Sequence, residues 1–451
     1  MFKYSLYFFL IVIFFAESSY SQWIQVSQVN NIGSYPSISA ANCSTVVIAG
    51  GLPNSPIVYL STNGGNNFSN ITTSDISRDL YCCWALNKDT IFAGDGGSPG
   101  GMGGNARVYM TTNGGLNWTI ILTTGGNSGF ISGIVFERPQ QDFGIIVSDP
   151  PNGNDSFWIA KTTNSGGNWI ITRAPFTPLY STQNSPFVVD SIFYGFGLIN
   201  PTTGPGRIYT TSNGGLSWNI RSFALSSNSV PSIAFQSDKL NGIALSDINL
   251  PNLAATTNGG INWQTYSAGA GAFGVGTVKW IRGTNIYYLS ANKIKRTSNG
   301  GLNWEEMNTG GIQNFVHMDI ISNSPTDICA YALATEGKVL KYEGEPFGIK
   351  QISSEIPDRF ELLQNYPNPF NPNTVINFSI GIPSGQLTFN SFTTIKIFDI
   401  LGKEAATLVY EQLKPGYYEV TWNAENYPSG VYYYMLTAGN YSETKKMVLI
   451  K

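Results

Sequence analysis

The sequence predicts an all-β chain in which a seven-bladed β-propeller is followed by a small β-sandwich. Three observations support this prediction. A turn-like motif returns six times, short β-rich runs lie between its copies, and the last part of the chain alternates apolar and polar residues without a helix-length apolar pattern. Repeats of 40 to 50 residues are typical of propeller blades, and short alternating strands are typical of sandwiches.

The motif is clearest at residues 112–118, which read TNGGLNW. Asn followed by two Gly between β-rich runs predicts a tight turn, because Gly adopts positive φ without strain and Asn can bond its own backbone. The aromatic residue that follows is expected to fold back over the turn and bury its ring. The six copies contain Asn63, Asn113, Asn164, Asn213, Asn258 and Asn299, followed by Phe68, Trp118, Trp169, Trp218, Trp263 and Trp304.

The spacing of the copies predicts the number of blades. The Asn positions 63, 113, 164, 213, 258 and 299 are separated by 50, 51, 49, 45 and 41 residues. Six copies close six blades, and residues 315–342 supply three strands of a seventh. We expect residues 23–26 to provide its missing outer strand. An N-terminal strand in that place closes the ring and removes the exposed sheet edge.

The motif resembles the Asp-box, or bacterial neuraminidase repeat, whose pattern is Ser/Thr-x-Asp-x-Gly-x-x-Trp. Thr111, Gly115 and Trp118 match it, but Asn replaces Asp in all six copies and Phe68 replaces the first Trp. The Asn-Gly-Gly variant is similar to propellers of the photosystem II assembly factor type and to bacterial surface proteins. The resemblance implies a structural turn at the blade periphery and no catalytic role for the motif.

Residues 1–21 are expected to be a secretory signal peptide. Lys3 precedes an apolar run at residues 6–16, and the small residues Ser19 and Ser21 follow it. The run is too short to span the ~30 Å hydrocarbon core of a bilayer. No later stretch is long and apolar enough for a membrane helix, so we expect an exported chain without a transmembrane segment.

The composition agrees with an extracellular β protein. Charged residues make up 12% of the chain, about half of the usual ~25%. Aromatic residues reach 13%, and the net charge is −3. This charge argues against nucleic acid or an anionic membrane surface as a partner.

The four cysteines, Cys43, Cys82, Cys83 and Cys329, allow three full pairings and do not form a disulfide framework in a chain of this length. Buried free thiols are the expected state. The alternative is a bridge between Cys43 and Cys329, which would fall on the first and last blades and join the ends of the ring.

The repeat pattern ends after residue 342. Residues 343–358 carry Pro346, Gly348 and Pro357 without periodicity, and we interpret them as a linker. Residues 359–451 are expected to form the β-sandwich. The propeller would then occupy residues 22–342.

Several stretches of the last domain resemble the type A C-terminal sorting domain of the type IX secretion system. They lie at 363–372, 398–403, 415–417, 427–432 and 445–449, in the order of that family. The resemblance implies recognition by the type IX machinery, transport across the outer membrane, and surface attachment or release. The residues of the sorting motif are Tyr366, Pro367, Asn368, Pro369, Phe370, Asp399, Gly402, Gly430, Tyr432, Lys445 and Lys446.

The inventory of reactive residues excludes several kinds of chemistry. His317 is the only histidine, so His-rich metal sites are excluded and a Ser-His-Asp triad would depend on it alone. It lies in an inner-strand pattern, where it is expected to pack or to line the channel. We expect no metal and no cofactor. A sialidase needs an arginine cluster and a Phe/Tyr-Arg-Ile-Pro segment, and the nearest fragment, FERP at 136–139, displaces the arginine.

Three carboxylates occupy equivalent places after the second strand of their blades: Asp95, Asp149 and Asp247. Their loops are expected to open on the face opposite the repeated turns. They could be simple loop starters, a sugar-binding or cation-binding ring, or the two carboxylates of a glycosidase, which lie ~5 to ~9.5 Å apart. The sequence favours an exported, non-catalytic binding or scaffold module. The alternative is a secreted polysaccharide hydrolase that uses two of these residues.

Overall fold

A computed structural model describes residues 22–451 except 99–100, 154, 179, 183–184, 201–204, 223–228, 247–252, 267–275, 283, 285, 298–299, 325–326, 344–348, 354, 383–390 and 425–426. The expected signal peptide, Asp247 and Asn299 therefore lie outside the described residues. Within the described ranges the secondary structure consists of strands β1 to β37. No helix among these residues is long and apolar enough to cross a membrane.

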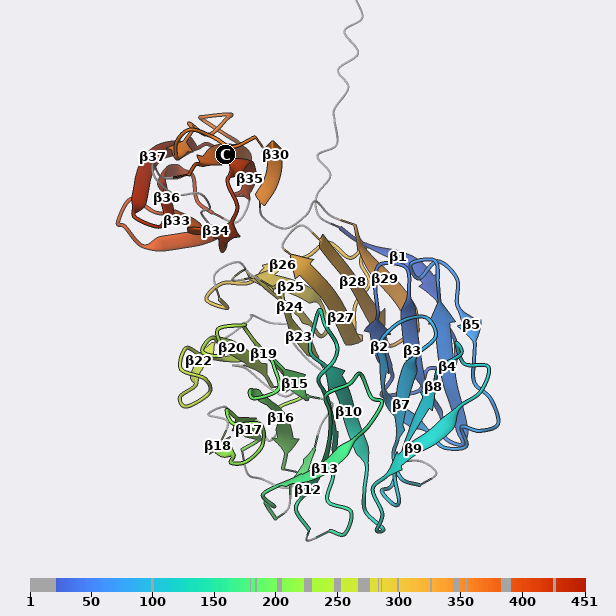
Figure 1. The fold of residues 1–451 in the computed structure, drawn as a ribbon. Helices are drawn as coiled ribbons and strands as arrows, with labels where there is room; N and C mark the ends of the chain where they lie inside the picture. The colour runs from blue at the N-terminus through green and yellow to red at the C-terminus, as the bar shows by residue number, and fades with distance from the viewer. Residues whose placement is uncertain are drawn as a thin grey trace, which may run out of the picture.

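Seven antiparallel sheets form the ring seen in Figure 1. Each sheet has a short inner strand beside the central channel and an outer strand at the rim. The first three blades contain β2 (Ser37–Ala40), β3 (Val46–Leu52), β4 (Ser55–Ser61) and β5 (Ser69–Asn70); β6 (Leu80–Ala85), β7 (Ile91–Asp95), β8 (Arg107–Thr111) and β9 (Thr119–Thr123); and β10 (Ile131–Phe136), β11 (Gly144–Ser148), β12 (Phe157–Thr162) and β13 (Ile170–Ala174).

The other four blades follow the same plan, with one additional strand in the fourth. They contain β14 (Ser181–Thr182), β15 (Phe187–Val188), β16 (Tyr194–Ile199), β17 (Arg207–Thr211) and β18 (Asn219–Ser222); β19 (Ser232–Phe235), β20 (Gly242–Leu245), β21 (Leu253–Thr256) and β22 (Gln264–Tyr266); β23 (Thr277–Trp280), β24 (Tyr287–Ser290), β25 (Ile294–Thr297) and β26 (Glu305–Glu306); and β27 (Phe315–Ser324), β28 (Asp327–Ala334), β29 (Lys338–Glu343) and β1 (Gln22–Gln28).

Burial within a blade follows from how the blades pack. Every residue of β7 and β11 is buried, because each of these strands has a neighbouring blade on both faces. Their sequences are accordingly continuous apolar and small runs, as expected for strands that are covered on both sides. The outer strand β9 is mostly exposed and alternates more loosely. The core is therefore divided into layers between successive blades.

The N-terminal strand closes the ring as the sequence predicts. β1 pairs with β29 in the seventh blade, and Trp23 lies opposite Tyr342. The Trp23 side chain is only 1% exposed. Its ring centroid lies 5.6 Å from that of Tyr342 and 6.1 Å from that of Tyr288. The first strand thus fills the last blade and contributes a large buried surface to it.

A disulfide also connects the two ends of the ring. Cys43, in the turn between β2 and β3, is bonded to Cys329 in β28. The hydroxyl of Tyr331 donates to the Cys43 carbonyl at 2.6 Å and supports the same junction. The expectation of free thiols is wrong for this pair, whereas Cys82 and Cys83 are buried free thiols. The fold brings Cys43 and Cys329 together because the first and last blades are neighbours.

The repeated motif forms a tight turn at the far end of the third strand. In the second blade the Thr111 hydroxyl donates to Asn113 Oδ1 at 2.9 Å, and this oxygen also accepts the Asn117 amide at 3.1 Å. Gly115 has φ +87°, and a Cβ there would lie 2.6 Å from Ile71 of the preceding blade. Trp118 is buried and donates from its indole to the Ile71 carbonyl at 3.1 Å. The turn therefore also joins adjacent blades.

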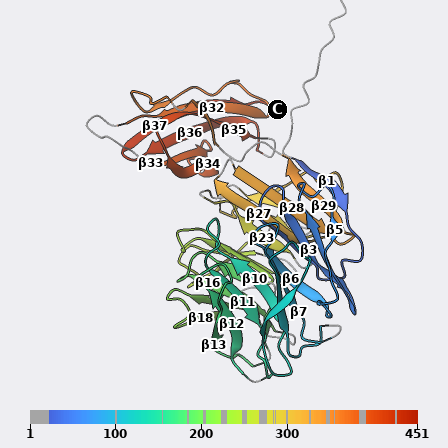
Figure 2. The same ribbon diagram turned by 45° about the vertical axis from the view of Figure 1, so that its right-hand side comes forward.

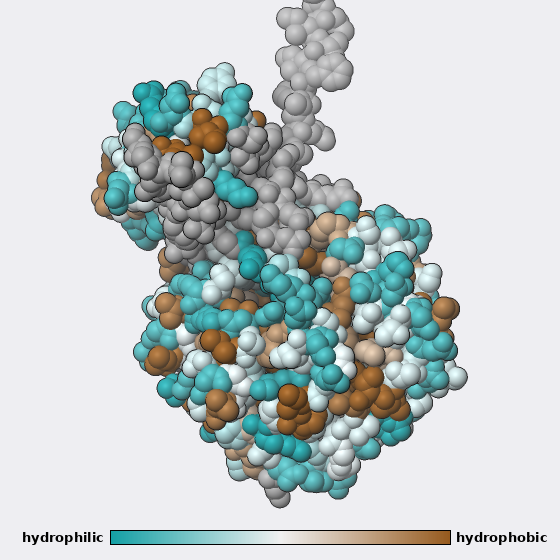
Figure 3. All heavy atoms as spheres, in the orientation of Figure 1, coloured by the Kyte–Doolittle hydropathy of each residue, from teal (hydrophilic) through white to brown (hydrophobic). Residues whose placement is uncertain are grey.

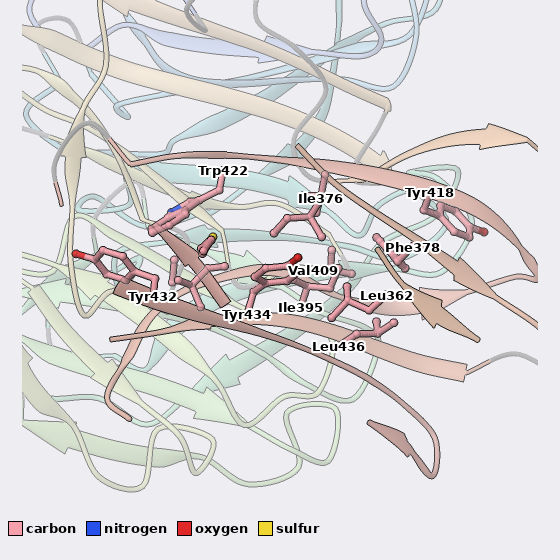
Figure 4. Packing of buried hydrophobic residues seen from close by; sticks show 14 of the residues in the cluster. Leu362, Ile376, Phe378, Ile395, Val409, Tyr418, Trp422, Tyr432, Tyr434 and Leu436 are labelled. Atoms are coloured by element: carbon pink, nitrogen blue, oxygen red, sulfur yellow. The ribbon is translucent and has the colours of Figure 1, made fainter. Parts of the chain in front are cut away.

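Two packed sheets form the C-terminal domain, as Figure 2 shows from the side. Their facing sides bury a single apolar cluster that includes Ile376, Ile395, Trp422 and Tyr434 (Figure 4). One sheet has the order β30-β35-β32-β31 and the other β34-β33-β36-β37. The strands are β30 (Ile349–Ser353), β31 (Glu361–Leu362), β32 (Asn373–Ile380), β33 (Ser391–Phe398), β34 (Glu404–Leu413), β35 (Gly416–Asn423), β36 (Gly430–Ala438) and β37 (Tyr441–Leu449).

One strand lies inside the stretch that the sequence suggested as a linker. β30 falls within residues 343–358 and pairs with β35, with Ile349 opposite Val420. Only five residues long, it is too short to show a clear period between Gly348 and Pro357. Its pairing with β35 covers an edge that the sandwich would otherwise expose.

Candidate functional site in the central channel

The seven inner strands surround an upper pocket of about 310 Å³ at one mouth of the channel. Every inner strand supplies a lining residue from its first residues or from the position just before it. These residues are Pro36, Tyr81, Ser132, Thr182, Pro231, Thr277 and His317. The upper pocket is thus centred on the ring, and its volume is at the lower end of the range found for small-molecule sites, ~300 to 1,000 Å³.

Aromatic residues form one wall of the upper pocket. Tyr81 and Phe130 lie 4.6 Å apart between ring centroids, and Tyr35 is 60% exposed beside them. A Cβ on Gly101 would lie 2.0 Å from the Tyr81 hydroxyl, so only glycine lets this loop approach the ring so closely. Burial raises the pKa of Tyr81, so its hydroxyl is neutral at pH 7. The wall therefore offers flat apolar surface with an uncharged polar group.

His317 forms the floor of the upper pocket. Its Nδ1 lies 3.0 Å from the Ile38 amide and 3.1 Å from the Ile38 carbonyl oxygen. Burial, together with the charge of Lys279, lowers the His317 pKa to about 4. The imidazole is neutral at pH 7 and is held by backbone groups of the first blade. This position agrees with the expectation that His317 packs against or lines the channel.

An ionic cluster lies deeper in the channel, beyond a cavity of about 40 Å³ that both His317 and Asp319 line. We use the name ionic cluster for Arg138, Lys279 and Asp319. The Asp319 carboxylate is 2% exposed; it accepts Arg138 Nη1 at 3.2 Å and Nη2 at 2.8 Å, and Lys279 Nζ lies 3.5 Å away. Burial opposes ionisation of Asp319, but the charges of Arg138 and Lys279 outweigh it and hold its pKa below the ordinary range.

Arg138 connects several blades across the channel. Beyond Asp319 it donates to the Ile320 carbonyl at 2.8 Å and to the Ala40 carbonyl at 2.8 Å. Its guanidinium lies 4.4 Å from the centroid of the Trp84 ring. Arg138 follows the inner strand of the third blade, so one side chain contacts the first, second and seventh blades as well. Such planar, bidentate contacts are ones that lysine could not reproduce.

The sequence did not identify the ionic cluster. Arg138 drew notice only because FERP resembles part of a sialidase segment, and Asp319 and Lys279 appeared as ordinary residues of inner strands. One signal could have pointed to them, because charged side chains in inner strands must face the narrow channel. The pairing itself joins residues 181 positions apart and needs the closed ring.

Asp95 points into its own blade. Its Oδ1 accepts the amides of Gly97 and Arg107, each at 2.9 Å, and its Oδ2 accepts the Tyr109 hydroxyl at 3.1 Å. The side chain is fully buried, and Arg78 Nη1 lies 3.9 Å away. Burial raises the Asp95 pKa against these contacts. Asp95 therefore organises the loop that covers Tyr81 and does not face a substrate.

Asp149 connects the third and fourth blades. Its Oδ1 accepts the Thr182 amide at 2.5 Å and the Thr182 hydroxyl at 2.7 Å. Since Thr182 lines the upper pocket, this contact fixes one side of the mouth. Asp95 and Asp149 are thus each occupied by different protein groups and do not face one another as an acid and base pair. Among the described residues, no group of three or more His, Cys, Asp or Glu is arranged to hold a metal.

Asp149 is expected to make the propeller less stable as the pH rises from about 4 to about 6. Burial raises its folded pKa to about 6 from an ordinary 3.8, against the Thr182 hydrogen bonds. The folded protein therefore keeps a proton in this window that the unfolded chain releases, and the stabilisation is lost as the pH passes 6. Asp149→Asn should remove a slope of at most about 3 kcal/mol in urea titrations across this range. Equal slopes in the two proteins would contradict the assignment.

The sorting-motif residues gather at one end of the C-terminal domain. Tyr366 is exposed and Phe370 is buried against Trp422. The Phe370 amide donates to the Val448 carbonyl at 3.0 Å, and the Val448 amide donates to Asn368 Oδ1 at 2.9 Å. The segment that contains Pro367 and Pro369 is thereby tied to the last strand. Asp399 and Gly402 form a turn at the end of β33, Gly430 and Tyr432 begin β36, and Lys445 and Lys446 belong to β37.

Comparison with known proteins identifies the C-terminal domain. The secretion system C-terminal sorting domain family matches residues 364–451. This match indicates export by the type IX system to the cell surface or the medium. A search of curated protein sequences found no match to the chain.

Solved structures resemble the chain in fold. The WD40 β-propeller domain of Doa1 has a TM-score of 0.50 at 13% identity, over 72% of this chain and 97% of that one. YCF48 bound to D1 peptide has a TM-score of 0.49 at 16% identity, over 71% and 96%. PorZ, a surface component of the type IX secretion system of Porphyromonas gingivalis, has a TM-score of 0.46 at 14% identity, over 92% and 59%. At such identities the likeness concerns the fold and not the function.

Proposed function

We propose that this chain, a β-propeller with a type IX secretion sorting domain, is a non-catalytic binding module that holds its ligand in the upper pocket. The observation that carries the proposal is the pocket itself. It is centred on the ring, and all seven inner strands contribute to it. A rigid ring that presents one concave mouth is a common platform for recognition.

The chemistry of the upper pocket favours a neutral glycan as the ligand. Tyr35, Tyr81 and Phe130 offer flat apolar faces on which a sugar ring can lie. Ser132, Thr182 and other hydroxyl groups can donate and accept hydrogen bonds with sugar hydroxyls. The lining contains no Asp, Glu, Lys or Arg, and His317 is neutral. A charged ligand would find no counter-charge in this lining.

Hydrolysis by two carboxylates receives little support from the contacts of the candidate residues. Asp95 is enclosed by hydrogen bonds within its blade, and Asp149 is engaged by Thr182. An acid and base pair needs both groups beside the same bond, within ~9.5 Å. We therefore place the binding role ahead of the glycoside hydrolase.

The domains divide the work of delivery and binding. Residues 1–21 would direct the chain through the inner membrane as a signal peptide, and residues 359–451 would direct it across the outer membrane. Residues 22–342 would then act at the cell surface or in the medium. The repeated Asn-Gly-Gly turns would serve only to join blades, in agreement with the likeness to the Asp-box. The contacts of Thr111, Asn113 and Trp118 support this structural role.

Tyr35→Ala is expected to weaken glycan binding about tenfold or more, because it removes an exposed aromatic face from the pocket without disturbing the core. The measurement is titration calorimetry of residues 22–451 with neutral oligosaccharides of plant, algal and bacterial origin. Tyr366→Ala is the matched control, since Tyr366 is also an exposed tyrosine but lies on the sorting domain. It should bind as the unchanged protein does.

Two further outcomes would overturn parts of the proposal. Release of reducing sugar from a polysaccharide panel that vanishes in Asp149→Asn would make the protein a hydrolase. Absence of binding to every neutral glycan, together with Tyr35-dependent binding of a peptide, would keep the pocket but replace the ligand class.

A further inference from the structure

The hairpin turn between β33 and β34 displays two large apolar side chains in solvent. Ile400 is 71% exposed and Leu401 is 88% exposed. The turn is rigid, because the Gly402 amide donates to the Asp399 carbonyl at 3.0 Å and Asp399 Oδ1 accepts the Leu401 and Lys403 amides, each at 2.9 Å. Gly402 has φ +79°, as expected after a four-residue turn of this kind.

Folding does not require apolar residues at the tip of this turn. The two central positions of such a turn accept most residues and are usually polar. Side chains this exposed bury little surface on folding and so add little to stability. Ile400 and Leu401 therefore suit a contact outside the domain better than they suit the fold.

The outer face of the neighbouring sheet continues this apolar surface. Phe398 lies opposite Tyr433, which in turn lies opposite Lys446, so their side chains share one face of the sheet. The adjacent residues Ile397, Tyr434 and Met447 point the other way, into the core. Figure 3 shows apolar surface on the visible side of this domain. We define the sorting face as Phe398, Ile400, Leu401, Tyr433, Lys403 and Lys446.

The sorting face has a basic rim. Lys396 pairs with Glu404 at 2.8 Å and Lys445 with Glu443 at 3.0 Å. The Asp399 carboxylate is occupied by turn amides. Lys403 and Lys446 have no carboxylate partner among the described residues, and both are exposed. Their charge favours a partner with acidic groups beside an apolar surface.

We propose that the sorting face docks on a component of the type IX export machinery through an apolar groove on that component that is rimmed by carboxylates. The match of residues 364–451 to the sorting family supplies the kind of partner, and the exposed apolar tip with its two lysines supplies the contact. The inference is independent of the ligand pocket, which belongs to the propeller. Leu401 would insert into the groove, with Phe398 and Tyr433 covering its edge.

The test follows delivery of the full chain in the bacterium that produces it. The double variant Ile400→Ser and Leu401→Ser is expected to reduce surface and medium levels about tenfold, with folded protein accumulating in the periplasm. Leu216→Ser with Leu302→Ser is the matched control, because these leucines are also exposed in tight turns but belong to the propeller. This control should be delivered normally. Protease resistance of the periplasmic pool reports whether the C-terminal domain is folded.

A second pair of variants keeps the test decisive if the serine variant is degraded. Lys403→Glu with Lys446→Glu should reduce delivery, and Lys403→Arg with Lys446→Arg should retain it, since these exposed side chains make no ion pair within the described residues. Normal delivery of both the serine and the glutamate variants would overturn the proposal. An equal loss of delivery in the propeller control would do so as well.

Discussion

Replacing Asp319 by alanine is expected to lower the free energy of unfolding of the propeller by about 3–5 kcal/mol. The change leaves the cations of Arg138 and Lys279 inside the channel without their shared carboxylate. It also removes the acceptor of the buried Ala40 amide. An uncompensated buried charge costs more than an intact buried pair contributes. Urea unfolding followed by tryptophan fluorescence measures the loss.

The control for this prediction is Asp155→Ala, an exposed carboxylate that contacts only the Asn152 side chain in the described structure. It should cost less than about 0.5 kcal/mol. Adding Arg138→Met to Asp319→Leu should recover part of the loss, because it removes one of the two orphaned cations. A loss below about 1 kcal/mol for Asp319→Ala would show that the ionic cluster does not hold the ring together.

Removing the disulfide by Cys43→Ser with Cys329→Ser is expected to destabilise the protein by about 2–5 kcal/mol. The bond closes a loop of 286 residues, so its loss frees a large part of the unfolded chain. It also leaves β1 as the only covalently independent closure between the first and last blades. Thermal unfolding of the oxidised protein and of the variant gives the difference.

Reductant provides the control within one protein. Dithiothreitol should lower the melting temperature of the unchanged chain to that of the serine variant and leave the variant unaffected. The buried thiols of Cys82 and Cys83 should not respond, because burial raises the pKa of both and keeps them as unreactive thiols. A melting temperature that reductant does not change would contradict a stabilising role for the bond.

The sequence by itself determined the parts of this protein that depend on local and periodic chemistry. Asn-Gly-Gly turns need positive φ, which Gly114 and Gly115 adopt, and their repetition at blade length predicted the ring. A β-rich segment before the first copy predicted that β1 would complete the last blade. The stretches around Pro367 and Gly402 identified the sorting domain, which the family match to residues 364–451 confirms.

Only the tertiary structure decided which side chains meet in the channel. Arg138 reaches Asp319, and Cys43 reaches Cys329, because closing the ring brings together residues that are far apart in sequence. The same closure assigned Asp149 to Thr182 of the next blade and enclosed Asp95 in its own loop. Residue type and spacing show where a carboxylate lies along a strand. The neighbouring blades determine which groups it contacts, and these contacts made Asp95 and Asp149 structural residues in place of an acid and base pair.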